Sequence, residues 1–128
     1  QLKKLKSSIS MYEKELLAAF LDDLNKSEYD VVLTELTLVM QELNGMIKNL
    51  KKYSKPKKVK ISIMNPMCGG RIIPEPYGTV LIVSPWNYPF QLALIPLIGA
   101  MAAGNTVVLK PSSSTPNVAN VIKKILYK

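Results

Sequence analysis

The sequence predicts an α/β fold in which an N-terminal helical pair and a β-hairpin lead into a βαβ unit. Three features support this: apolar residues at helical spacing in 1–53, turn residues between two short β-prone runs, and two apolar runs that flank a helical one. Near-continuous apolar strands are typical of a buried parallel sheet. We divide the chain into N-terminal helices (1–53), a linker and hairpin (54–77) and a βαβ region (78–128).

The composition of the chain excludes several kinds of site. The 128 residues include one Cys and no His. A single Cys cannot form an internal disulfide, and without His the chain alone cannot form a Ser-His-Asp triad, a Cys-His pair or a His-based zinc site. The nine acidic residues are scattered, so we expect no metal site. Nothing in the cysteine content indicates an oxidising compartment, and we expect a cytoplasmic protein.

The net charge of +8 is concentrated in one place, because seven lysines lie between Lys48 and Lys60. Such a run is typical of nucleic-acid or anionic-membrane binding, or of a solvated helix end, where the helix dipole favours cations. Only one aromatic residue, Tyr53, interleaves the lysines. We therefore favour a solvated helix end and expect no nucleic-acid partner.

The first predicted helix runs from Ile9 to Leu24, where apolar residues recur at three- and four-residue steps. A break follows, and Ser27 with Asp30 then resembles a capping box that begins a second helix. This pattern predicts two amphipathic helices in succession.

The second helix carries a heptad seam, which indicates either a coiled-coil dimer or a helix that packs on its own domain. We favour the second interpretation, because three heptads that contain Gly45 would form a weak zipper. The seam consists of Val32, Leu36, Val39, Leu43, Met46, Leu50 and Tyr53.

Two short β-prone runs, Val59–Ile63 and Arg71–Pro76, follow the second helix. The connection 64–70 has turn chemistry throughout, so the runs predict a hairpin or a pair of edge strands. Pro74 and Pro76 suit only an edge.

Thirty-four uncharged residues separate Glu75 from Lys110, which is long enough for a membrane-spanning helix. Proline and glycine interrupt this run and leave no unbroken apolar helix of about twenty residues. The interruptions are Pro85, Pro89, Pro96, Gly78, Gly99 and Gly104. We therefore expect a soluble protein with no membrane span.

The last third of the chain alternates strands, loops and helices. We expect its two strands to be buried and parallel with a right-handed crossover, Gly104-Asn105 to end the first helix, and Thr115 to cap the last. In order, the predicted elements are strand Thr79–Val83, loop Ser84–Tyr88, helix Pro89–Ala103, strand Thr106–Leu109, loop Lys110–Thr115 and a helix from Pro116.

Each of the two strands is followed by a polar residue at the sheet edge where ligands bind in such folds. Asn87 could donate a hydrogen bond to a developing oxyanion, and Lys110 could hold ribose hydroxyls or phosphates. Alternatively, Asn87 only caps the following helix and Lys110 only extends to solvent. The pattern alone leaves both interpretations open.

Two segments, Tyr77–Phe90 and Gly99–Ser112, resemble the signature motifs of the aldehyde dehydrogenase superfamily in order and separation. The continuation Tyr88-Pro89-Phe90 is similar to the class three and fatty-aldehyde branch. The resemblance implies an N-terminal part of an NAD(P)-dependent enzyme that oxidises an aldehyde to a carboxylic acid. It also implies that residues 78–128 begin a Rossmann-like cofactor domain, that the strands in 54–77 serve oligomerisation, and that the parent enzyme is a homodimer.

The same resemblance implies the roles of individual residues. Asn87 would share an oxyanion hole with the amide of a catalytic Cys, and Lys110 would bind the adenosine ribose. Family members commonly have Glu where this chain has Ser113, and the loss of that carboxylate makes NADP plausible beside NAD. The implied cofactor-binding residues are Ser84, Pro85, Trp86, Lys110, Ser112 and Ser113.

The catalytic Cys and the general-base Glu of the family lie further along the family chain. Cys68 cannot replace that nucleophile, because it precedes a Gly-Gly turn with no base nearby. We therefore expect residues 1–128 alone to be inactive. The alternatives are an acylating, CoA-dependent aldehyde dehydrogenase, a non-enzymatic helical interaction module, and a nucleic-acid-binding protein that uses the lysine run.

Overall fold

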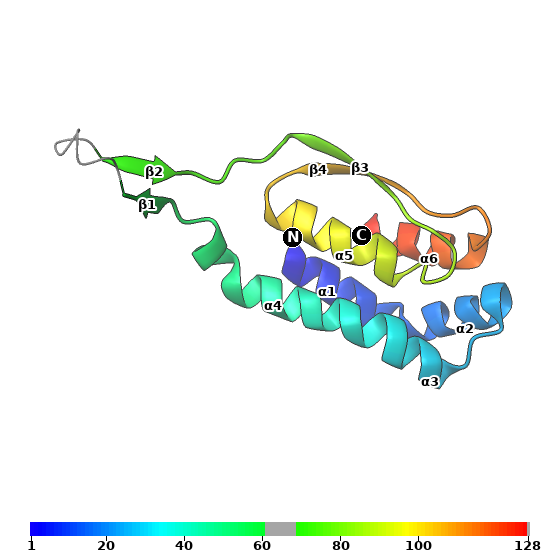
Figure 1. The fold of residues 1–128 in the computed structure, drawn as a ribbon. Helices are drawn as coiled ribbons and strands as arrows, with labels where there is room; N and C mark the ends of the chain where they lie inside the picture. The colour runs from blue at the N-terminus through cyan, green and yellow to red at the C-terminus, as the bar shows by residue number, and fades with distance from the viewer. Residues whose placement is uncertain (61–68, 128) are drawn as a thin grey trace.

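The computed structural model describes residues 1–60 and 69–127, and it confirms the α/β fold class (Figure 1). Helices precede a small antiparallel pair of strands, and a βαβα succession follows. The elements are α1 (Leu2–Met11), α2 (Glu13–Leu24), α3 (Glu28–Val31), the π-helical turn η1 (Val32–Leu36), α4 (Thr37–Tyr53), β1 (Lys57–Val59), β2 (Gly70–Ile72), β3 (Thr79–Val83), α5 (Gln91–Ala102), β4 (Thr106–Lys110) and α6 (Pro116–Leu126).

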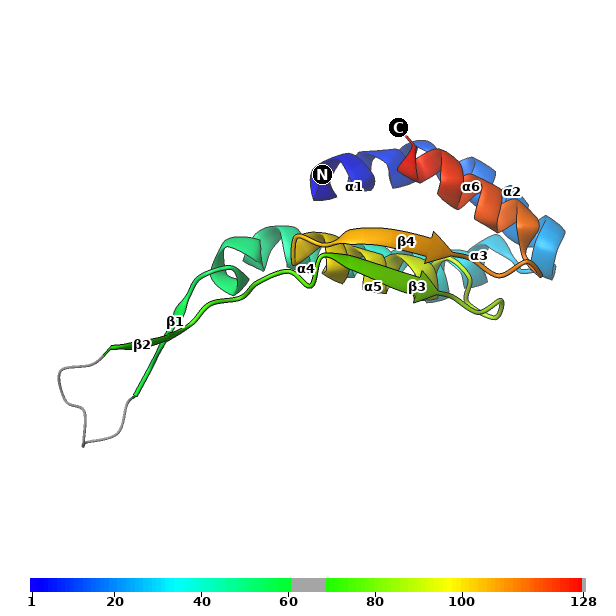
Figure 2. The same cartoon turned by 90° about the horizontal axis from the view of Figure 1, so that it is seen from above.

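The helices form layers beneath one face of the β3–β4 sheet. The sheet lies on α5, and α5 lies on α4, while α1, α2 and α6 pack together beside this stack (Figures 1 and 2). The β1–β2 pair extends away from the body as an arm. Helices from 1–53 and 78–128 share one hydrophobic core, whose largest fully buried apolar side chains are Phe20, Phe90, Ile9, Leu16, Leu43, Leu94, Ile98 and Ile122.

The predicted single helix over Ile9–Leu24 is wrong. The chain bends at Tyr12 (φ −98°, ψ 10°), which separates α1 from α2. The bend lets α1 pack on α4, α5 and α6, whereas α2 packs mainly on α6 and also on α3. Both helices bury apolar residues of the predicted stripe, so the spacing identified the buried face but not the break.

The second helix begins as predicted, because the Ser27 hydroxyl accepts a hydrogen bond from the Asp30 amide at 3.2 Å. Its seam packs on the chain's own core, as we favoured. The prediction fails at both ends of the seam: Tyr53 is exposed, and Val32 is exposed while Val31 is fully buried. The end at Val32 has a structural cause. The π turn explains this difference: its five-residue hydrogen bond aligns Val31, rather than Val32, with Leu36.

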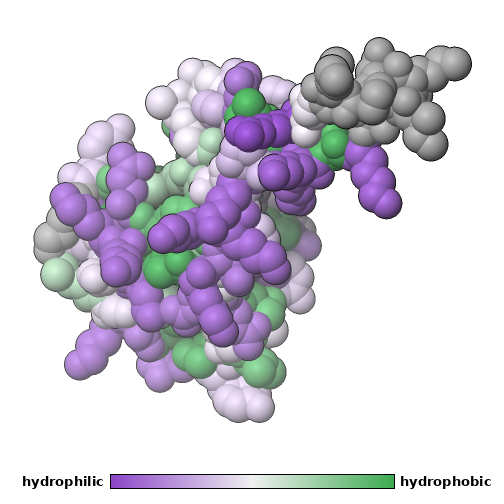
Figure 3. Space-filling view, turned by 90° about the vertical axis from the view of Figure 1, so that its left-hand side faces the viewer, coloured by the Kyte–Doolittle hydropathy of each residue, from purple (hydrophilic) through white to green (hydrophobic). Residues whose placement is uncertain are grey.

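The lysine run continues beyond the helix end that we expected it to cover. Lys51 and Lys52 lie in the last turn of α4, but the run extends along the arm to Lys60. All seven lysines are exposed, and hydrophilic side chains dominate the face seen in Figure 3. The solvent-exposed lysines therefore lie both at the end of α4 and along the arm.

The hairpin prediction is confirmed in type but not in extent. β1 and β2 pair antiparallel, from Lys57 with Ile72 to Val59 with Gly70. The first strand begins two residues earlier than predicted, and Pro74 and Pro76 lie beyond the second. Residues 61–68, which include Cys68 and most of the first predicted strand, lie outside the described residues.

β3 and β4 pair in parallel across the predicted helix, which confirms the βαβ unit. Gly104 adopts φ +87° after α5, as its predicted role as a stop requires. Three boundaries differ: α5 begins at Gln91 rather than Pro89 and ends at Ala102 rather than Ala103, and β4 includes Lys110. No helix in residues 1–60 or 69–127 is long and apolar enough to cross a bilayer.

The prediction that both strands are buried is wrong for one face of the sheet. Leu81, Val83 and Val108 are 67%, 62% and 55% exposed, whereas Ile82, Val107 and Leu109 contact the core. Within residues 1–60 and 69–127, helices cover only one face of the β3–β4 sheet. An apolar pattern on both faces of a strand therefore does not predict that helices of this chain cover both faces.

The predicted Thr115 cap of α6 is also wrong. The Thr115 hydroxyl is buried and caps nothing; instead, Asp23 of α2 accepts hydrogen bonds from the backbone amides of Asn117 (3.3 Å) and Val118 (2.8 Å). A carboxylate at a helix N-terminus satisfies free amides and interacts favourably with the helix dipole. The cap therefore comes from a helix more than ninety residues earlier.

We predict that Asp23→Ala lowers the free energy of unfolding by about 1–2 kcal/mol, the usual cost of a lost helix cap. Asp22→Ala is the matched control, because Asp22 is exposed and its carboxylate makes no hydrogen bond among the described residues. Urea denaturation of the three proteins measures the difference. Equal stabilities of the two variants would contradict a capping role for Asp23.

Candidate functional site

The carboxyl ends of β3 and β4 meet at one edge of the sheet, as the sequence predicted. Val83 and Lys110 form the last pair of the ladder, and the Ser84 amide donates to the Lys110 carbonyl oxygen at 3.1 Å. The loop that carries Asn87 and the loop that carries Ser113 therefore leave the sheet side by side. Ligands bind at this edge in parallel α/β sheets.

The Asn87 side chain is exposed in the first of these loops. Among the described residues it makes no hydrogen bond, and the first amide of α5, that of Gln91, donates to Glu35 rather than to Asn87. The alternative role of Asn87 as a helix cap therefore has no support in the structure. Its amide is free to donate to a molecule bound at the sheet edge. Trp86, its neighbour, is 57% exposed.

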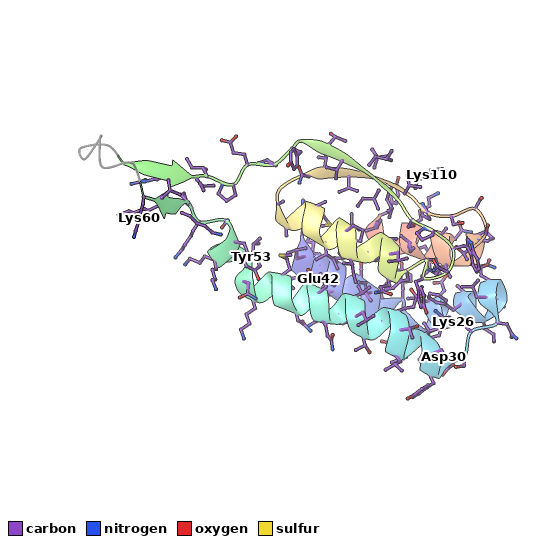
Figure 4. All side chains as sticks on the ribbon, viewed as in Figure 1. Lys26, Asp30, Glu42, Tyr53, Lys60 and Lys110 are labelled. Carbon is purple, nitrogen blue, oxygen red and sulfur yellow. The ribbon has the colours of Figure 1, made fainter. Side chains whose placement is uncertain are left out.

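The second loop presents several polar groups at the same edge. Lys110 lies exposed at the end of β4 rather than in the loop (Figure 4). The Ser112 hydroxyl accepts from the Ser114 amide at 3.2 Å, which stabilises a tight turn, and Ser113 is exposed on that turn. A ligand could therefore reach Lys110 and Ser113 together.

Two buried hydroxyl groups near this edge have no hydrogen-bond partner within the described part of the chain. They belong to Ser84, which directly follows β3, and to Thr115, which ends the second loop. An unsatisfied buried hydroxyl costs about 1–3 kcal/mol, and such groups usually find a ligand or a water. Both hydroxyls are consistent with a polar ligand at the sheet edge.

A buried ion pair beneath the first loop was not predicted from the sequence. Glu35 of η1 is fully buried, and its carboxylate accepts from Lys26 Nζ at 2.9 Å and from the backbone amide of Gln91 at 2.8 Å. Burial raises the pKa of the Glu35 carboxyl above its ordinary value of 4.5, while the hydrogen bonds from Gln91 and Lys26 oppose that rise.

The Lys26 ammonium of this pair also lies over the Tyr88 ring, 4.3 Å from its centroid. In the sequence, Lys26 lies in the break before the second helix, and Glu35 is one of the nine scattered acidic residues. One signal of this pair is present in the sequence: Glu35 is a charged residue inside the largely apolar run 31–40. That signal does not identify the partner of Glu35. Within residues 1–60 and 69–127, no cluster of three or more metal-binding side chains occurs.

Comparison with known proteins gives a consistent result. The model of the "Aldehyde dehydrogenase family" matches residues 1–128. The chain is 46% identical over 98% of its length to 4,4'-diaponeurosporen-aldehyde dehydrogenase of Staphylococcus aureus, and 42% identical over 98% to aldehyde dehydrogenase family 3 member A2 of Pongo abelii. It also superposes on the substrate-bound structure of Staphylococcus aureus AldH with a TM-score of 0.97, at 46% identity and 99% coverage.

The chain spans 28% and 26% of these two relatives, and 28% of the solved chain. The match nevertheless includes both signature segments and every element described above. Similarity to class three members agrees with the branch that the Tyr88-Pro89-Phe90 motif indicated. The chain belongs to the aldehyde dehydrogenase family.

Proposed function

We propose that this chain is the N-terminal part of an NAD(P)-dependent aldehyde dehydrogenase that oxidises an aldehyde to a carboxylic acid. One observation carries the proposal: the loops of both signature segments leave the same edge of the β3–β4 sheet, and Asn87 presents a free amide there. That edge is the usual ligand site of a parallel sheet.

In the proposed reaction, Asn87 donates a hydrogen bond to the carbonyl oxygen of the aldehyde as negative charge develops on it. Lys110, Ser112 and Ser113 would hold the ribose of the cofactor, and the segment Ser84–Trp86 would line the nicotinamide. The buried hydroxyl of Ser84 fits this assignment, because it lacks a partner in the described chain. When bound, the nicotinamide accepts a hydride from the aldehyde carbon.

The resemblance further implies a Cys nucleophile and a Glu general base that residues 1–128 do not supply. We therefore infer that this chain alone oxidises no aldehyde, and that the activity belongs to a full-length enzyme that contains it. A homodimeric, cytoplasmic enzyme is part of the same proposal.

The proposal is tested by product analysis of a full-length enzyme that contains this chain. Straight-chain and aromatic aldehydes are supplied with NAD or NADP, in the presence and absence of CoA. We expect one carboxylic acid and one reduced cofactor for each aldehyde consumed, without a requirement for CoA. Formation of acyl-CoA alone would instead indicate the acylating enzyme, and reduction of neither cofactor would reject both.

We predict that Ser113→Glu shifts the preference of the full-length enzyme towards NAD, mainly by weakening NADP. A carboxylate there would accept the ribose 2′-hydroxyl and repel a 2′-phosphate, which Lys110 can otherwise attract. Comparison of kcat/KM for the two cofactors measures the shift.

Ser114→Glu is the matched control, because it adds the same charge one residue away on the same exposed turn. We expect a smaller change of the cofactor ratio in this variant. An unchanged ratio in Ser113→Glu, or a shift towards NADP, would mean that the Lys110–Ser113 turn is not at the ribose.

A further inference from the structure

The buried carboxylate of Glu35 joins two parts of the chain that are far apart in the sequence. It lies in the π turn of the second helix, yet it accepts a hydrogen bond from the backbone amide of Gln91, fifty-six residues later. Gln91 is the first residue of α5 and directly follows the loop that carries Asn87. Glu35 therefore fixes the end of that loop at the point where it enters the helix.

Lys26 holds the same loop through its contacts with Glu35 and Tyr88. Its ammonium bonds to Glu35 at 2.9 Å and lies 4.3 Å from the centroid of the Tyr88 ring, with Phe20 at 5.5 Å on the core side. Cation–aromatic contacts at this distance are attractive, and more so when the cation is largely shielded from water. Tyr88 is the immediate neighbour of Asn87, so the pair holds both Tyr88 and Gln91.

Burial of a charged pair is not required for the stability of this core. A buried carboxylate loses its hydration, and apolar residues of similar volume often stabilise a fold equally well. At this position, however, apolar residues could not bind the Gln91 amide or attract the Tyr88 ring electrostatically. The charge favours one loop geometry, and displacement of a reacting group by about 1 Å can lower a rate about a hundredfold.

We propose that Glu35 and Lys26 are positioning residues that hold the Asn87 loop in the geometry aldehyde oxidation requires. The catalytic part of this inference rests on the function proposed for Asn87. The structural part, that the pair holds the loop, does not depend on that function. Neither residue touches the reacting atoms; both act through the backbone and the Tyr88 ring. Figure 4 shows Lys26 at the end of the molecule where α2 meets α3, and η1, which carries Glu35, contacts α5.

The test is a double-mutant cycle in the full-length enzyme that contains this chain. Glu35→Gln preserves shape and removes charge, and we expect kcat to fall about ten- to a hundredfold with little change in the KM for cofactor. In an Asn87→Ala background the same substitution should change kcat less than about twofold, because the positioned group is gone. Glu42→Gln, on α4 away from the loop, is the matched control and should retain kcat (Figure 4).

Hydrogen exchange provides a readout that does not depend on activity. Glu35→Gln and Lys26→Met should each increase amide exchange in residues 84–91, while exchange in α6 stays as in the unmodified protein. Unchanged exchange in 84–91 would overturn the proposal. A loss of kcat that persists in the Asn87→Ala background would also overturn it, since the pair would then act elsewhere. If the unmodified enzyme oxidises no aldehyde, the proposed function fails, and exchange still decides whether the pair holds the loop.

Discussion

Asn87→Ala in a full-length enzyme that contains this chain should lower kcat by about a hundredfold or more, the usual cost of a lost oxyanion donor. The expected loss is large because the Asn87 amide has no competing role in the described structure: it is exposed, unpaired and caps no helix. Cofactor binding should change little, since the donor acts on the aldehyde oxygen. Steady-state kinetics with a saturating aldehyde give kcat, and cofactor titration gives the Kd.

The matched control is Asn44→Ala, which removes an exposed amide from α4 whose described partner is the surface residue Lys6. It should leave kcat unchanged. If Asn87→Ala also retained kcat, Asn87 would not be the oxyanion donor, and the assignment of the sheet edge to catalysis would lose its main support.

Phe90→Ala should lower the free energy of unfolding by about 3–5 kcal/mol, the range for removal of a buried aromatic side chain. Phe90 is fully buried immediately before α5, in the core that helices from both halves of the chain share. Leu92→Ala is the control, because Leu92 is 37% exposed and should cost less than about 1 kcal/mol. Equal losses in urea denaturation would contradict the packing described here.

The elements that the sequence predicted correctly depend on local chemistry. Gly104 ends α5 because glycine tolerates the positive φ required there, and Ser27 begins α3 because its hydroxyl can reach an amide three residues later. The order of strand, helix and strand then determined a parallel sheet. The meeting of the two loops at one edge follows from that order, so the location of the candidate site was predictable.

The features that were missed depend on contacts between distant residues. Asp23 caps α6 from α2, and Glu35 binds the start of α5 from η1, and neither pairing leaves a periodic pattern in one sequence. The π turn shifts the buried face by one residue at Val31 without a Pro or Gly to indicate it. Whether a strand face is covered also depends on what packs against it. We expect further elements of a full-length enzyme to cover Leu81 and Val108.

The rate of the first turnover tests the central claim most directly, because it isolates the chemistry from product release. A full-length enzyme that contains this chain is mixed rapidly with saturating cofactor and aldehyde, and the absorbance of the reduced nicotinamide is followed. We predict rapid formation of reduced cofactor in the unmodified enzyme and a rate about a hundredfold or more lower in Asn87→Ala, the loss expected of an oxyanion donor. A first turnover equally fast in both proteins would contradict the claim that this loop stabilises the developing oxyanion.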